Sequence, residues 1–176
     1  MTPPGPRALT AVLGLTLLAT ATAATVPLRS VLESSPGNLG SIRTSGTFFI
    51  VSKAVPQSRA LVLGVGSGGA YQNRVSTVRV FAQKEYLTPA ERKVFNAAVL
   101  NVALKCFNLR AERQAAITAW LDRQNASTFR DVNADFGPMN LQFLRELDDD
   151  GTYWTVISMT REGQPGVSPW INYCKP

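Results

Sequence analysis

The sequence predicts an α+β domain in which an antiparallel sheet of about five or six strands packs against a central helix pair, in the order βββααβββ. Two observations predict this class. Short runs rich in β-branched and aromatic residues, bounded by Gly, Pro, Asn or Asp, lie on both sides of the chain's centre. Between them, over residues 88–124, apolar residues recur at helical spacing.

The N-terminal residues are typical of a secretory signal peptide. Arg7 is the only charge there, the apolar stretch 8–19 follows it, and the small-residue tract TATAA comes next. Ala21 and Ala23 fit an AxA cleavage site, so we expect residues 1–23 to be removed and the protein to be secreted or periplasmic. The apolar run is shorter than the roughly 20 residues that span a bilayer. An uncleaved anchor or a buried core helix is the alternative.

The rest of the chain is long enough for one domain. Residues 24–45 are rich in Ser, Gly and Pro, as in ESSPGNLGS, and we expect a flexible lead-in there. Residues 46–176 then form a single α+β domain, with no transmembrane segment in the mature chain. The net charge is +6, and the basic residues are spread along the chain. This balance favours anionic surfaces, including cell-envelope polymers.

Three strands are expected before the helices. Residues 47–55, TFFIVSKAV, are aromatic and β-branched and stop at Pro56. Residues 60–65, ALVLGV, form a second apolar run after the turn residues PQSR. In residues 74–82, RVSTVRVFA, the density of β-branched residues favours a strand over a helix.

The first helix has a clear start. Thr88 suits the N-cap, Pro89 the first helical position, and Glu91 completes a capping box. An apolar stripe at helical spacing then continues to about Phe107. The stripe consists of Phe95, Ala98, Val99, Val102 and Cys106.

A second helix is expected over roughly residues 109–124. Its apolar face is marked by Ile117, Trp120 and Leu121. Arg110 and Arg113 lie in the more polar remainder. We interpret them as part of a solvated face and keep them as candidate binding residues.

Three extended segments are expected after the helices. Residues 139–143 alternate between apolar and polar side chains, which indicates a half-buried strand. The stretch DDDG supplies a tight turn, and residues 152–160, TYWTVISMT, complete a hairpin. Pro169 places the final segment, residues 167–174, at a sheet edge.

The chain contains two cysteines, Cys106 and Cys174. In an oxidising compartment an even pair is most simply a disulfide, which would tie the end of the first helix to the last strand. Two buried free thiols are the alternative.

Residues 60–73, ALVLGVGSGGAYQN, contain a complete GxGxxG in Gly64, Gly66 and Gly69. A dinucleotide fingerprint needs a helix that begins at these glycines, because the helix N-terminus binds the pyrophosphate. Glu85 has the spacing of a ribose-binding acid, but the intervening residues have the pattern of a strand. We therefore expect no cofactor and interpret the glycines as a flexible hairpin connection.

Within this stretch, Ser67 to Tyr71 have the sequence SGGAY. The pattern resembles the short SGxxY loop of bacterial periplasmic lysozyme inhibitors. The resemblance implies a loop that enters a lysozyme active-site cleft and blocks it, with Ser67, Gly68 and Tyr71 as binding residues.

The chain contains no histidine. This absence removes the commonest general base, the Ser-His and Cys-His nucleophile arrangements, and most zinc sites. A carboxylate hydrolase acting on envelope polymers stays open as an alternative. Asp131, Asp135 and Glu146 are its candidate acids, because a glycosidase needs two carboxylates that flank a cleft.

The stretch DVNADFG partly imitates a calcium loop, with candidate ligands Asp131, Asn133 and Asp135 at positions one, three and five. An EF-hand loop has Gly at position six and Glu at position twelve, where this chain has Phe136 and Gln142. The simpler interpretation is an Asx-rich turn before a strand.

Aromatic and basic residues together would suit single-stranded nucleic acid, with bases stacking on Tyr71, Tyr86, Trp120 or Trp154. However, both tryptophans lie on predicted amphipathic elements and are expected in the core. The charge is also not gathered in a patch. The sequence therefore favours a non-catalytic binding module that recognises a protein or an anionic envelope polymer, over a hydrolase and a lysozyme inhibitor.

Overall fold

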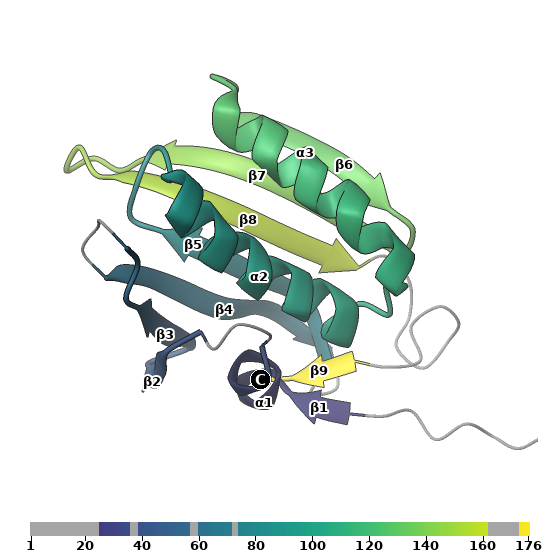
Figure 1. The fold of residues 1–176 in the computed structure, drawn as a ribbon. Helices are drawn as coiled ribbons and strands as arrows, with labels where there is room; N and C mark the ends of the chain where they lie inside the picture. Colours follow the sequence, from purple (N-terminus) through teal and green to yellow (C-terminus); the bar gives the residue numbers. More distant parts are fainter. Residues whose placement is uncertain (1–24, 36–38, 57–59, 72–73, 162–172) are drawn as a thin grey trace, which may run out of the picture.

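The computed structural model describes residues 25–35, 39–56, 60–71, 74–161 and 173–176. They form an α+β fold in which helices α2 and α3 lie across one face of a large antiparallel sheet (Figure 1). The predicted signal peptide lies outside the described residues, as does most of the predicted final segment.

The elements follow one another as β1 (Thr25–Pro27), α1 (Leu28–Glu33), β2 (Ser41–Ser45), β3 (Phe48–Lys53), β4 (Leu61–Tyr71), β5 (Arg74–Ala82), α2 (Pro89–Cys106), the 3-10 helix η1 (Ala111–Arg113), α3 (Gln114–Ala126), β6 (Asp131–Phe136), β7 (Met139–Leu147), β8 (Tyr153–Arg161) and β9 (Tyr173–Lys175). The main sheet has seven strands in the order β2-β3-β4-β5-β8-β7-β6, and every neighbouring pair is antiparallel. Two meanders thus meet at β5 and β8. β1 and β9 form a separate parallel pair.

The start of α2 confirms the predicted capping box. The Thr88 hydroxyl accepts a hydrogen bond from the Glu91 backbone N–H, and the Glu91 carboxylate accepts one from the Thr88 N–H. Glu91 is buried, and the ammonium of Lys84 compensates its charge at 2.6 Å. The loop between β5 and α2 is thereby fixed to the first turn of the helix.

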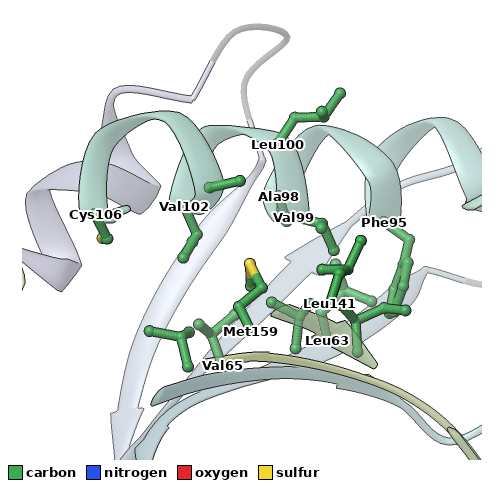
Figure 2. Close-up of a cluster of buried hydrophobic side chains, with 14 of the residues drawn as sticks. Leu63, Val65, Phe95, Ala98, Val99, Leu100, Val102, Cys106, Leu141 and Met159 are labelled. Carbon is green, nitrogen blue, oxygen red and sulfur yellow. The ribbon is translucent and has the colours of Figure 1, made fainter. Parts of the chain in front are cut away.

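The core lies between the sheet and the two long helices. Figure 2 shows apolar side chains of α2 pointing onto the strands beneath them. The contact joins Phe95, Val99 and Val102 of α2 to Leu63, Val65, Leu141 and Met159 of the sheet. On α3 the predicted apolar face is confirmed, because Ile117, Trp120 and Leu121 are all buried.

Arg145 of β7 is buried beneath the end of α3, with 4% of the residue exposed. Its guanidinium donates five hydrogen bonds, all to backbone carbonyls. The acceptors are Glu85, Gln124, Asn125, Ser127 and Phe129. Desolvation by burial lowers the pKa of Arg145. The side chain joins β7, the end of α3 and the loop that precedes α2.

Arg161 of β8 has the same role at the end of α2. Its Nη2 donates to the carbonyl of Cys106 at 3.0 Å, and its guanidinium lies 5.4 Å from the centre of the Phe107 ring. Burial lowers the pKa of Arg161 to about 10. Each long helix therefore ends on a buried guanidinium supplied by the sheet.

The predicted disulfide is confirmed. Cys106, the last residue of α2, is bonded to Cys174 of β9. Since Cys174 also lies opposite Val26 in the parallel pair, the bond connects β1 to the helical layer as well.

The sequence predicts a flexible lead-in over residues 24–45, and the described part of this range forms regular secondary structure. This part contains β1, α1 and β2, and α1 buries Leu28, Val31 and Leu32. Asn101 of α2 donates a hydrogen bond from its side-chain amide to the Val31 carbonyl. These residues therefore belong to the fold.

Three other expectations also need correction. The sheet has seven strands instead of five or six, because β2 and β6 were not expected. The stretch DVNADFG is a strand, β6, followed by a turn at Gly137, and not an Asx-rich turn. The described part of the final segment, β9, pairs with β1 and not with an edge of the main sheet.

Reduction of the disulfide should lower stability markedly. Because the bond closes a loop of 68 residues, its loss is expected to cost about 4 kcal/mol and roughly 10 °C in melting temperature. Thermal melts of the protein with and without reductant measure this. The Cys106→Ala, Cys174→Ala double variant is the control, and its melt should not respond to reductant. An unchanged melt of the parent protein would contradict the expected contribution.

Arg145→Lys should destabilise the protein by about 3 kcal/mol, because a lysine has three donors and leaves buried carbonyls unpaired. Equilibrium unfolding in urea measures the change. Arg123→Lys, at an exposed position in the last turn of α3, is the matched control and should stay within about 0.5 kcal/mol of the parent. Equal stabilities of the two variants would show that the carbonyl contacts are not important.

Candidate functional site

The face of the main sheet opposite α2 and α3 is the candidate site, and we call it the open face. Strand register defines one row of residues across it. From β3 to β7 the row is Ile50, Gly64, Phe81, Val156 and Leu144. Val62 lies two residues before Gly64 on β4, on the same face, and is 52% exposed. The middle of the open face is therefore apolar.

Three glycines at alternate positions of β4 face this surface: Gly64, Gly66 and Gly68. They lie inside the strand, so the expectation of a flexible hairpin connection is wrong for these residues. A Cβ atom built on Gly64 would lie 2.1 Å from the ring of Phe81. Gly64 is therefore required because the Phe81 ring lies directly over the backbone of β4. No helix begins at the GxGxxG, so these residues lack the context of a dinucleotide site.

Phe81 is the centre of an aromatic row formed by Phe48, Phe81 and Trp154. The ring centroids are 5.8 Å apart for Phe48 and Phe81 and 5.7 Å apart for Phe81 and Trp154, and both pairs are edge to face. All three side chains are half-buried. The expectation of a core position is correct for Trp120 and wrong for Trp154, which lies on the open face.

The orientation of Trp154 is fixed by the turn between β7 and β8. Its indole N–H donates to the Asp148 carboxylate at 2.7 Å. The turn itself is closed by the Gly151 N–H, which donates to the Asp148 carbonyl, as the DDDG stretch predicts. A hydrogen bond from the Thr152 backbone N–H lowers the pKa of Asp150.

Next to the aromatic row, Arg79 and Glu146 form an ion pair at 2.9 Å. Their side chains are 47% and 43% exposed, so both groups are accessible to a partner. A cleft of about 220 Å³ is lined by Arg79, Phe81, Glu146, Asp148, Trp154 and Val156. This arrangement combines an apolar aromatic floor with a donor and an acceptor at its side, which suits binding through packing and hydrogen bonds.

The structure does not bring the candidate catalytic carboxylates together. The Asp131 carboxylate accepts a hydrogen bond from Gln142, and that of Asp135 accepts one from Asn140. Glu146 is paired with Arg79. Each acid thus has its own polar partner on the sheet, and of the three only Glu146 lines the cleft of the open face.

The calcium candidates also lie apart. Asp131, Asn133 and Asp135 are alternate residues of β6, and alternate residues of a strand are about 6.6 Å apart. One calcium ion needs its oxygen ligands at about 2.4 Å. An extended strand does not bring these three side chains around one ion. In the described part of the chain, no group of three or more His, Cys, Asp or Glu residues is placed to hold a metal ion.

Residues 67–71, which carry the lysozyme-inhibitor resemblance, belong to β4 instead of a loop. Ser67 lies opposite Val78, and Gly68 lies opposite Thr77 on the open face. The connection to β5 and the side chain of Tyr71 lie outside the description. The looped shape that the resemblance implies is therefore not found in these residues.

The remaining candidates lie elsewhere. Arg110 and Arg113 are exposed at η1, beside a hollow of about 700 Å³ that includes Gly137 and Pro138. Tyr86 is half-exposed with the Arg145 guanidinium 4.4 Å from its ring centre, whereas Trp120 is buried against Phe136. These aromatic residues do not form one stacking platform. The arginines do not line the cleft of the open face.

Comparisons with protein-family models, curated proteins and solved structures gave no match. In the described ranges, none of the helices combines the length and the apolar character needed to cross a membrane.

The aromatic row is the feature that sequence reasoning missed. The sequence signal that could have revealed it is the spacing of Gly64, Gly66 and Gly68. Alternate residues of a strand share one face, so a strand that continues through these glycines leaves room on that face for a ring.

Gly64→Ala should destabilise the protein by about 1–3 kcal/mol, since the new methyl group must displace the Phe81 ring from between Phe48 and Trp154. Urea unfolding and Trp154 fluorescence measure the change. Gly66→Ala is the matched control, because its Cβ would meet its nearest neighbour at 3.4 Å, an ordinary contact. If both substitutions have the same small effect, Phe81 does not depend on Gly64.

Proposed function

We propose that this protein is a non-catalytic binding module, secreted or periplasmic, whose open face binds a protein partner. The aromatic row beside the Arg79–Glu146 pair is the observation that supports this function. Aromatic residues and arginine are enriched at the energetic centres of protein interfaces. A half-exposed row of rings next to accessible charges matches that composition.

The charges of the open face favour a protein over an anionic polymer. Arg79 is balanced by Glu146, Asp148 lies beside Trp154, and Arg43, opposite Ile50, adds one cation at the β2 edge. Towards the β6 edge the face carries Asp131 and Asp135. An anionic polymer would be repelled by these carboxylates. A protein surface with its own aromatic and basic side chains would complement them.

The proposed location has two supports. The N-terminal residues have the order of a signal peptide. The Cys106–Cys174 bond fits an oxidising compartment, where disulfides form and persist.

The function is tested by capture with matched variants. Immobilised mature protein is exposed to the secretome and envelope extract of its own host, and bound proteins are identified by mass spectrometry. Each candidate is then purified and titrated against the parent, Trp154→Ala, Arg79→Ala and the control Arg123→Ala. A true partner should lose at least about tenfold in affinity with Trp154→Ala and keep its affinity for the control.

The Arg79→Ala variant keeps the test valid if Trp154→Ala lowers stability, because Arg79 is half-exposed. Melting temperatures establish that each variant is folded. A partner that binds all variants equally would contradict the proposed surface. Retention by purified envelope polymer alone, with no protein partner, would contradict the proposed class of partner.

A further inference from the structure

A second surface lies between α2 and α3. The two helices enclose a groove of about 640 Å³. Its lining includes Arg92, Asn96, Leu100 and Leu104 of α2 and Thr118 and Asp122 of α3. Leu100 points away from the sheet (Figure 2), so the groove lies on the side of the helices opposite the core. It is separate from the open face.

The groove is charged and polar at the end formed by Arg92, Asn96 and Asp122, and at the other end Leu100 and Leu104 share the lining with Gln114 and Thr118. Asn96 donates from its side-chain amide to Asp122 at 3.2 Å, so the start of α2 lies beside the end of α3. Arg92 is one turn before Asn96, at the polar end. Leu100 and Leu104 continue the same stripe of α2 towards the other end. The Thr118 hydroxyl already donates to the carbonyl of Gln114.

Two buried polar atoms at the polar end have no hydrogen-bond partner among the described residues. They are Oδ1 of Asn96, an acceptor, and Nε of Arg92, a donor. Asn96 is only 6% exposed. Buried polar atoms are nearly always paired in native proteins, because an unpaired one loses its hydration without compensation. The pair therefore calls for a ligand that brings one donor and one acceptor together.

An extended peptide residue meets this requirement, because its N–H and C=O point to the same side of the chain. Its N–H would donate to Asn96 and its carbonyl would accept from Arg92. A fatty carboxylate would satisfy Arg92 alone, and an ammonium group, which has only donors, would satisfy Asn96 alone. Leu100 and Leu104 offer contact to apolar side chains of the same ligand. We propose that the groove between α2 and α3 binds a short apolar peptide in extended conformation.

The probe is acetyl-Leu-Leu-Leu-amide, titrated calorimetrically into the mature, disulfide-bonded protein. Its three analogues each carry one N-methylated leucine, which removes a single N–H donor. The parent peptide should bind, and at least one analogue should bind about tenfold more weakly, since an acceptor is left unpaired. Decanoate, which is apolar and anionic but has no peptide group, should also bind at least about tenfold more weakly.

Substitutions of Asn96 and Arg92 test whether these side chains bind the peptide. Asn96→Leu should weaken the parent peptide about tenfold and remove the difference between it and the sensitive analogue. Arg92→Met keeps an apolar stem and should weaken all peptides similarly. Lys105→Met, exposed on the same helix and outside the groove, is the matched control and should bind like the parent protein. Melting temperatures establish that each variant is folded. If Asn96→Leu does not fold, the affinity of Arg92→Met for the peptide is used to test the proposal.

Three results would overturn the proposal. They are the absence of peptide binding at millimolar concentration, decanoate binding as tight as the peptide, and binding that is unchanged by both groove variants. Trp154→Ala on the open face should leave peptide affinity unaltered. If Trp154→Ala abolished peptide binding while the groove variants did not, the peptide would be bound at the open face and the groove proposal would be wrong.

Discussion

The arrangement of the helical layer depends on two buried arginines. The last carbonyls of a helix have no partner within it and carry the negative end of the helix dipole. Arg145 and Arg161 supply guanidinium donors to these carbonyls from neighbouring strands, β7 and β8. Burial makes both charges costly, as their lowered pKa values indicate. Because each charge is compensated only when its helix ends above its strand, the two contacts fix where α3 and α2 stop.

Both candidate surfaces depend on this constraint. With both helix ends held on the sheet, α2 and α3 are antiparallel and leave a groove along their outer side. The same contacts keep the helices on one face, so the aromatic row lies on the opposite one. The disulfide adds a covalent connection at the point where Arg161 contacts α2, since Cys106 takes part in both. The protein therefore has two sides with different chemistry.

Local signals in the sequence predicted the elements that local interactions decide. The capping box at Thr88, the apolar faces of both helices, the turn at Gly151 and the cysteine pair needed no knowledge of distant residues. The elements β2 and β6 were missed because their Ser and Asp residues favour turns, while pairing with β3 and β7 makes them strands. Buried arginines give no sequence signal that separates them from solvated ones.

The placement of Trp154 shows how a face is chosen by non-local packing. In β8 the residues Trp154 and Val156 alternate with Thr155 and Ile157, so both faces of the strand are partly apolar. Register decides between them, because Ile157 lies opposite Phe143, whose side chain belongs to the core. Trp154 therefore lies on the open face. Its neighbour Phe81 can lie over β4 on this face only because Gly64 of β4 has no side chain beneath the ring. Further along β8 this face changes to Ser158 and Thr160, so its apolar character is confined to the middle of the sheet. A confined patch with ordered polar edges is what a binding surface requires, whereas a uniformly apolar face would favour aggregation.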